Sequence, residues 1–464
     1  MGNPTTEVTR RLAGWVDELR FADLPADAVE MAKSTVLDFL GCALQGSQRP
    51  HAIAATALQM DLGGAEQATI LGTRRRTSVD RAAFLNGTFG SSTPQFDDVS
   101  KEALGHPGVG THPAVLAVGE HQHASGRDAL VAVVAGYELA WRIGAGVGLD
   151  AFNRGWHPRG GFNVFAAAVA AAKLLGLQGE NTYCNVLGLA GNQAAGLMSA
   201  CFWHDAWYLL SGHASQNGVL AALLAEAGYG AGCTVIEDDY GGYGHVVADE
   251  PDFERMLEGL GQQFQVTLTG QKPHSSSATT HASIDAVLSL REGDGVDPDL
   301  VDTIEVRTYQ VAAETMGRTH PRTHLHATMS IPYLVSRALL DGQIQLEQFT
   351  PEKLDGPEVN ALQDRVRMVV DPELDRLAPH HLAATVIVNT RDGGSTSRTV
   401  TVPRGDPENP MPLSEIEAKY RRLASGILET DAIEETVQVV RHLDDLDDVA
   451  DLAAVLRRVV DNDR

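Results

Sequence analysis

The chain has 464 residues, of which 43% are apolar and 21% are charged, and this ordinary globular composition excludes wholesale disorder. The 61 acidic and 36 basic side chains give a formal net charge of −25, which disfavours binding to nucleic acids and to anionic membranes. The four cysteines form no CxxC pair, which excludes zinc-ribbon and thioredoxin-like sites and predicts reduced thiols in a cytoplasmic protein.

The N-terminal half of the chain has the apolar spacing of packed helices. Apolar residues recur at helical intervals from Val8 to Leu19, and a second helix is predicted from Pro25, a favourable first-turn residue. Further helices are predicted at 113–124, 126–147, 161–177, 184–200 and 212–228, with a glycine-rich loop at 87–110. No apolar run is long enough, without a charge, to predict a membrane span.

The pattern changes near residue 262. Alternating apolar residues predict strands at 264–268, 304–308, 384–388 and 399–403, and helices are predicted at 280–292, 329–341 and 358–367. A helical pattern returns after Pro412 and ends in an acidic helix at 446–460. The sequence therefore predicts a mainly α fold, with a large all-helical domain built from residues 1–267 and 404–464. A smaller α+β domain, 268–403, is inserted into it.

Two clusters in the helical half could carry chemistry. The loop QFDDVSKEALGHPG holds Asp97, Asp98 and His106, which are suitable groups for proton transfer, although caps or Asx turns would also explain the acids. In RGWHPRGG, His157 directly precedes a predicted core helix. The helix dipole would lower the pKa of such a histidine and favour a neutral base; a histidine that satisfies backbone groups in a tight turn is the equal alternative.

Two clusters lie in the predicted α+β domain. In TGQKPHSSSATTH, Lys272 could hold a carboxylate as a point charge, although a solvated loop lysine is the ordinary interpretation. The histidines at 320, 324 and 326 have a spacing open to metal binding, but Pro321 interrupts a helix there and no acid lies within the run, so a loop role is favoured. The GxSxG, GxxxxGK[ST] and HExxH patterns are absent.

In this order, the clusters resemble the MmgE/PrpD family. The segments that carry the resemblance are DFLGCALQG (38–46), FLNGTFGSSTPQFDD (84–98), GHPG (105–108), GWHPRGGFNVFAAAVAAAKLLGL (155–177), GLAGNQAAGLM (188–198), IEDDYGGYG (236–244), KPHSSSATTHASIDA (272–286) and SIPYLVSRALLDG (330–342). They cover nearly the whole chain, and the ordered set is specific where no single motif is.

The resemblance implies a large helical domain, an α+β lid domain, a homodimer and a pocket between the domains. It also implies chemistry on a small carboxylate-bearing substrate without a metal or another cofactor. A proton or a carboxylate leaves the carbon next to an acid group, and the enzyme stabilises the enolate-like charge that results.

The catalytic residues implied by the resemblance come from four motifs. His106 matches the histidine after the acidic loop, His157 that of the WHP-like motif, Lys272 the lysine of the KPxP-like motif, and Tyr333 the tyrosine of the SxPY-like motif. The predicted substrate contacts are Gln95, Asp97, Asp98, Trp207, His213, His274 and Ser277. The later histidine of the lysine motif, His281, is expected to be structural.

The chain departs from the family pattern at several of these positions. Gln95 stands where the family's first acid is expected, Trp207 at a lysine position, His213 at an arginine position and Ser277 at a cysteine position. A substrate with three carboxylates would lose partners, and unpaired buried charge is costly. The aromatic residues at 202, 203, 207 and 208 could line a less polar pocket, or could pack in the core.

The sequence therefore predicts a cofactor-independent lyase, a dehydratase or a decarboxylase. His157 or His106 would transfer the proton, Lys272 would hold a carboxylate or the developing charge, and Tyr333 would donate a hydrogen bond or relay a proton. One alternative is an isomerase, epimerase or specialised-metabolism cyclase that acts on a less charged, more apolar substrate. The other is a non-catalytic binding protein with a degenerate site.

Overall fold

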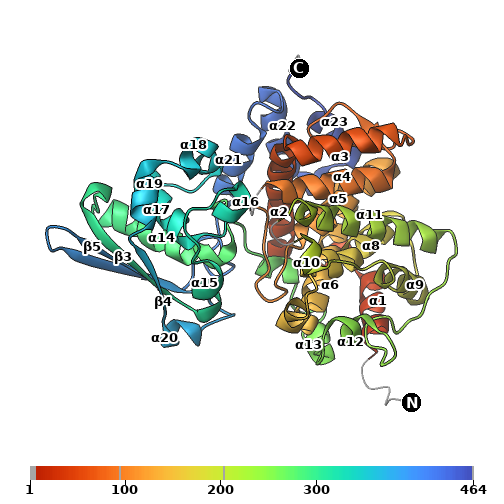
Figure 1. The fold of residues 1–464 in the computed structure, drawn as a ribbon. Helices are drawn as coiled ribbons and strands as arrows, with labels where there is room; N and C mark the ends of the chain where they lie inside the picture. Colours follow the sequence, from red (N-terminus) through yellow and green to blue (C-terminus); the bar gives the residue numbers. More distant parts are fainter. Residues whose placement is uncertain (1–6, 94–95, 202–203, 462–464) are drawn as a thin grey trace. The chain divides into compact units, whose positions relative to one another are not determined.

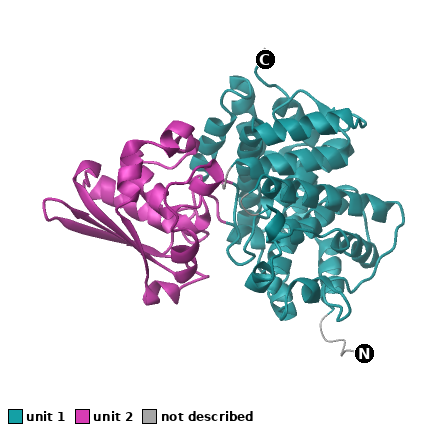
Figure 2. Ribbon diagram, in the orientation of Figure 1, with its two compact units in different colours: residues 1–93, 97–269, 412–464 teal, residues 94–96, 270–411 magenta. Residues whose placement is uncertain are grey.

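The computed structural model describes residues 7–93, 96–201 and 204–461 and divides the chain into two compact units (Figure 2). Unit 1 comprises residues 1–93, 97–269 and 412–464, and unit 2 comprises 94–96 and 270–411, compared with the insert expected at 268–403. The expected mainly α fold is confirmed, because helices form most of the chain and the strands lie in small sheets (Figure 1).

Unit 1, in its described residues, is helical apart from a short antiparallel hairpin, β1 (Ala68–Thr69) with β2 (Arg76–Thr77). Its α-helices are α1 (Val8–Glu18), α2 (Ala26–Ser47), α3 (Pro50–Asp61), α4 (Val79–Ser92), α5 (Gly108–Gln122), α6 (Gly126–Asn153), α7 (Pro158–Gly161), α8 (Asn163–Leu174), α9 (Glu180–Gly191), α10 (Met198–Cys201), α11 (Ala206–Glu226), α12 (Tyr243–Val247), α13 (Phe253–Leu257), α21 (Leu413–Ala424), α22 (Thr430–Arg441) and α23 (Val449–Leu456). Its 3₁₀ turns are η1 (Phe21–Asp23), η2 (Gln265–Leu268) and η5 (Leu443–Asp445).

Helix α8 is the centre of unit 1. It packs against α5, α6, α9 and α11, and all its side chains from Asn163 to Ala172 are buried. Small residues make this packing possible, because a Cβ on Gly218 of α11 would lie 2.5 Å from Ala167 Cβ and 2.7 Å from the Val164 carbonyl oxygen. The alanine-rich motif thus gives a tightly packed support directly behind α7 and the histidine that precedes it.

Helix α6 is long and apolar enough, by length and composition, to cross a membrane, yet 94% of its most apolar window is buried in the structure. Such burial is typical of the core helix of a globular protein. Glu138 and Arg142 form a fully buried ion pair on this helix, 2.8 Å apart. Arg142 also donates to the carbonyls of Met256 and Glu258, so the pair fixes the segment around α13 against α6.

Both ends of the chain contribute to unit 1. Helix α21 packs on α2, and at their contact Lys419 Nζ lies 2.6 Å from Asp38 Oδ1 with both side chains at most 2% exposed. A buried ion pair of this kind requires both partners, because either charge alone would be left in a medium of low dielectric constant. The pair therefore ties the C-terminal helices to the N-terminal part of the unit.

Unit 2 is built on a four-stranded sheet in the order β4-β3-β5-β6. Its strands are β3 (Val301–Thr308), β4 (Val366–Val370), β5 (Ala384–Thr390) and β6 (Ser395–Val400); β3 runs parallel to β4 and antiparallel to β5, and β5 and β6 form a hairpin. Its helices are α14 (Ala278–Gly293), α15 (Gln310–Thr315), α16 (His324–Ala327), α17 (Ile331–Asp341), α18 (Pro351–Leu354), α19 (Pro357–Gln363) and α20 (Pro372–Asp375), with 3₁₀ turns η3 (Pro298–Leu300) and η4 (Leu346–Phe349). Helices α14 and α17 pack together, and α14 covers β5 and β6.

The predicted helices and strands differ from the observed ones at three places. At two of them, a hydrogen bond or a neighbouring strand outweighs the local sequence pattern. The strand predicted at 264–268 is wrong, because residues 265–268 form η2, and the Gln265 N–H donates to the buried Glu138 carboxylate at 2.8 Å. The helix predicted at 358–367 ends at Gln363, and the next residues enter β4 beside β3. The loop predicted from residue 87 begins later, because α4 continues to Ser92.

Replacing Lys419 by Met should lower the free energy of unfolding by about 3–5 kcal/mol, because it leaves the Asp38 carboxylate buried without its cation. Urea denaturation measures the change. Arg376→Met, at an exposed ion pair, is the control and should change stability by less than about 0.5 kcal/mol. An equally small effect of both substitutions would contradict the structural role of the buried pair.

Candidate active site

The acidic loop between α4 and α5 holds the first catalytic candidate. Asp97 and Asp98 are 2% and 4% exposed. His106 Nδ1 lies 3.0 Å from Asp97 Oδ2 and 2.6 Å from the Asp98 carbonyl oxygen, and Asn163 donates to the His106 carbonyl at 3.0 Å. Both partners of Nδ1 are acceptors, so Nδ1 carries a proton and the neutral ring has its lone pair on Nε2. His106 is thereby oriented as a proton-transfer group.

The same carboxylate oxygen also binds an arginine. Arg159 Nη2 lies 3.2 Å from Asp97 Oδ2, and Arg159 is 1% exposed. Its guanidinium carbon lies 5.5 Å from the centre of the Trp207 ring. Asp97 thus lies between a guanidinium and an imidazole, where it can stabilise a positive charge on His106.

His157 caps the N-terminus of α7. Its Nδ1 accepts the Arg159 backbone N–H at 3.1 Å, its own N–H donates to the Gly196 carbonyl, and Trp207 meets its ring edge-on at 4.4 Å. Burial, and then the charges of Arg159 and His106, hold the pKa of His157 well below its usual range. With Nδ1 used as the cap, the neutral ring presents Nε2–H. The sequence left open a neutral base or a histidine that satisfies backbone groups in a turn. The ring caps the Arg159 N–H and presents a hydrogen-bond donor.

A buried chain of hydrogen bonds holds the loop from behind. The Tyr137 hydroxyl donates to Asp98 Oδ2 at 2.6 Å, so the His112 Nε2, 2.9 Å from that hydroxyl, donates to it in turn. The Gly108 N–H also binds the Asp98 carboxylate, and a Cβ on Gly108 would lie 2.9 Å from it. Burial raises the pKa of Asp98 to about 7, although the bond from Tyr137 opposes this.

A further cation lies at the start of α3. No described residue accepts a hydrogen bond from the buried Arg49 Nε–H, and burial lowers the pKa of Arg49. The neighbouring His51 stacks on Tyr208 with ring centres 4.4 Å apart, and its Nε2 lies 2.8 Å from Ser92 Oγ. Arg49 and Arg159 both act electrostatically on Tyr208. A half-buried guanidinium without a carboxylate partner in the described chain is a suitable group to bind an anion.

Unit 2 carries Lys272, His274 and Ser277. Lys272 is 2% exposed, and the residues on either side of it are fixed, because Gln271 N–H donates to the Gly405 carbonyl and Gln345 donates to the Pro273 carbonyl, both at 2.9 Å. Ser277 precedes α14, and its hydroxyl lies 2.8 Å from Thr279 Oγ1. His274 lies 2.8 Å from Asp285.

Two predicted residues in the described part of the chain do not join either group. Tyr333 belongs to the hydrophobic core of unit 2, is 0% exposed, and its hydroxyl donates to the Gln348 carbonyl; this engaged hydroxyl favours a structural role over the predicted proton relay. The His213 ring, on α11, packs against Phe84 at 5.1 Å. Gln95 lies outside the described residues, as do the aromatic residues at 202 and 203.

The predicted histidine run does not form a metal cluster. His320 pairs with Asp364 at 2.7 Å, and the His324 ring stacks on Phe349. Among the residues that the structure describes, Asp97, Asp98 and His106 are close enough together to hold a metal ion. The Arg159 guanidinium and the His106 N–H both contact Asp97 Oδ2, so this oxygen already has two partners from the protein.

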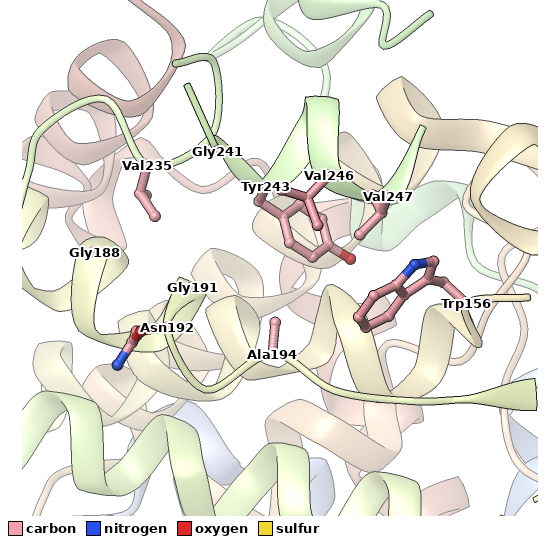
Figure 3. Close-up of a pocket in the computed structure, with 10 residues that line it drawn as sticks. All are labelled: Trp156, Gly188, Gly191, Asn192, Ala194, Val235, Gly241, Tyr243, Val246 and Val247. Carbon is pink, nitrogen blue, oxygen red and sulfur yellow. The ribbon is translucent and has the colours of Figure 1, made fainter. Parts of the chain in front are cut away.

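A cavity of about 360 Å³ lies in another part of unit 1 (Figure 3). Trp156, Tyr243, Val246 and Val247 line it together with the end of α9. None of the predicted catalytic residues lines it, although Trp156 directly precedes His157. We therefore place the candidate site at the buried loop and not at this cavity.

The sequence interpretation missed Arg159, Tyr137 and Arg49 as site residues. Arg159 lies inside the quoted WHP motif, and the signal was a second basic side chain in the first turn of a buried helix. Tyr137 directly follows an apolar stretch from Ala129 to Gly136. Arg49 lies in a polar turn and gave no pattern of its own.

Comparison with known proteins gives matches over most of the chain. Residues 10–256 match the model of the MmgE/PrpD N-terminal domain, and residues 274–445 match that of the C-terminal domain. The chain is 32% identical to the cis-aconitate decarboxylase-like protein oryM of Aspergillus oryzae, over 98% of each protein. It is 30% identical to the cis-aconitate decarboxylase of Aspergillus terreus (98% of this chain, 96% of the relative) and 26% identical to that of Homo sapiens (97% and 94%).

The raised pKa of Asp98 predicts a specific pH dependence of stability. Between about pH 4 and pH 7 the folded protein keeps a proton that the unfolded chain has lost, so this contribution is complete below pH 4 and is lost as the pH rises through 7. Over this pH range the free energy of unfolding should fall by up to about 1.4 kcal/mol for each pH unit of increase. Asp98→Asn should remove it in urea titrations, whereas Asp364→Asn, at an exposed acid, should not. An unchanged slope in Asp98→Asn would refute the assignment.

Proposed function

The chain belongs to the MmgE/PrpD family and is an enzyme of that family, and we propose that it is a decarboxylase acting on a polycarboxylate related to cis-aconitate. The observation that carries the proposal is the buried arrangement of His106, Asp97 and Arg159 beside the neutral His157. These groups can supply a proton and bind a developing negative charge.

The proposed step needs one proton and no redox partner. The bond between the substrate carbon and its carboxylate breaks, CO₂ leaves, and the electron pair stays on the substrate as an enolate-like anion. His157 Nε2–H donates to the oxygen that carries this charge. Protonated His106 gives its Nε2 proton to the carbon, becomes neutral, and regains a proton from water, while Asp97 stabilises its charged form.

Substrate binding in this proposal uses a cation of unit 1. Arg49 would hold a substrate carboxylate. The carboxylate contact expected from the sequence for Lys272 of unit 2 remains a prediction. Trp207 stands where the family pattern has a lysine, so the positive charge expected there is missing. Arg49 supplies a positive charge of its own, which favours a substrate with several carboxylates. The homodimer, the closing of a lid, the cofactor independence and the cytoplasmic location expected from the sequence remain predictions.

A second candidate function is isomerisation or cyclisation of a less charged substrate. Trp207 supports it, because this aromatic side chain contacts both the His157 ring and the Arg159 guanidinium, where a lysine was expected. The same proton-transfer groups would serve that chemistry. CO₂ release from cis-aconitate, followed by mass spectrometry of the product, distinguishes the two candidates.

His106→Gln should lower kcat for decarboxylation by about 10²–10⁴-fold, because the proton donor is removed. His157→Asn can keep the cap on the Arg159 N–H but loses the Nε2–H, and should lower kcat by about 10²-fold. Steady-state CO₂ release measures both effects. The exposed His442→Asn is the control, and an activity of His106→Gln equal to that of this control would eliminate the mechanism.

Arg49→Gln should raise KM for a tricarboxylate by about ten- to a hundredfold, as expected for losing a charge-assisted hydrogen bond of roughly 1.5–3 kcal/mol. Substrates with one carboxylate fewer should be less affected. The exposed Arg75→Gln is the matched control. Equal KM values for Arg49→Gln and wild type with every acid tested would show that Arg49 does not bind substrate.

A further inference from the structure

His274 and Asp285 form a histidine–carboxylate pair inside unit 2. His274 Nε2 lies 2.8 Å from Asp285 Oδ1, and His274 is 7% exposed. The other oxygen of Asp285 accepts the Arg404 N–H at 2.7 Å. The carboxylate is therefore fixed by two bonds, and it holds the histidine that follows Lys272 by two residues.

The protonation of this ring follows from its partner. A carboxylate only accepts, so Nε2–H donates to Asp285 and Nδ1 of the neutral ring keeps the lone pair. That Nδ1 is buried and has no hydrogen-bond donor within the described part of the chain. A buried acceptor without a donor is costly and uncommon, and such groups concentrate at functional sites.

Another pair in unit 2 shows the contrast. His320 Nε2 binds Asp364 Oδ1 at 2.7 Å, but the pair is exposed on the surface, and His320 Nδ1 lies 3.2 Å from Asn360 Oδ1. In that pair both ring nitrogens have polar neighbours. The His274 pair differs in being buried, and its second nitrogen has no hydrogen-bond partner in the described part of the chain.

The surroundings of His274 supply charge as well as burial. Its ring meets the His281 ring at 5.2 Å, nearly edge-on, and His281 Nε2 lies 3.3 Å from the Ser276 carbonyl oxygen. Lys272 brings an ammonium group two residues away along the chain. A lysine and a carboxylate-supported imidazole in one segment suit a ligand with a carboxylate and an acidic hydrogen beside it.

We propose that His274, supported by Asp285, is a second proton-transfer residue, which reversibly removes a hydrogen from the carbon next to a substrate carboxylate. This rests on the proposed function for the class of substrate. Nδ1 forms an N–H bond as the C–H bond breaks, the electron pair moves into the carboxylate as an enediolate, and Asp285 balances the imidazolium. The reverse transfer returns the proton, or a solvent deuteron, to the carbon.

The test is hydrogen exchange in D₂O. Wild-type protein is incubated with cis-aconitate or tricarballylate, and deuterium in the recovered acid is measured by NMR and mass spectrometry. His274→Gln can keep the contact with Asp285 but has no base at the Nδ1 position, so exchange should fall by about 10²-fold or more. His274→Asn should lose it similarly, and Asp285→Asn should reduce it by about tenfold, because an amide supports the imidazolium less well.

The control is His320→Gln, which changes the exposed pair and should leave exchange within about twofold of wild type. Thermal midpoints by circular dichroism identify any variant that fails to fold. The exchange rates of the variants that do fold then decide whether His274 transfers the proton. No exchange by wild-type protein with either acid, or full exchange in a folded His274→Gln, overturns the proposal even if CO₂ release continues. Exchange that depends on His274 supports it even if no CO₂ is released, so the two proposals fail separately.

Discussion

The carboxylate of Asp97 is the interaction on which the candidate site of unit 1 depends. One of its oxygens binds the Arg159 guanidinium and the His106 ring within 3.2 Å, and all three groups are nearly or fully buried. A buried anion is stable only while the guanidinium and the imidazole N–H that contact it remain in place, since removal of either leaves part of its charge without compensation. This constraint orients His106. It also fixes the position of Arg159, whose backbone N–H donates to His157 Nδ1.

The neighbouring acid has a different environment although it is the next residue. Asp98 receives hydrogen bonds from Tyr137 and Gly108, and no basic side chain in the described part of the chain forms an ion pair with it. Burial dominates its pKa. Two adjacent carboxyl groups thus acquire distinct roles, one as a counter-ion and the other as a structural acceptor close to its point of protonation. Unit 2 uses a third acid, Asp285, to hold His274.

Patterns of residues predicted the helical core and the sheet better than they predicted the site. The alanine-rich α8 and the alternating residues of β3 and β5 follow local rules, because burial on one face or on all faces leaves a clear periodicity. The motifs located His106 and His157 but not their partners. Arg159, Tyr137 and Arg49 are identified by spatial contacts between distant segments. The catalytic role of Tyr333 stays a prediction, and its hydroxyl donates to the Gln348 carbonyl in the core of unit 2.

The close packing between α8 and α11 has a consequence for how such a protein can diversify. At Gly218 a single added methyl group would meet neighbouring atoms at 2.5 Å, so the middle of α11 tolerates almost no change in volume. The first turn of the same helix carries Trp207 and Tyr208, whose rings pack against His157 and His51. One helix thus combines a middle that excludes added volume with an N-terminal turn beside the candidate site. Changes of substrate preference are therefore expected from substitutions in that turn, which leave the packing between α8 and α11 intact.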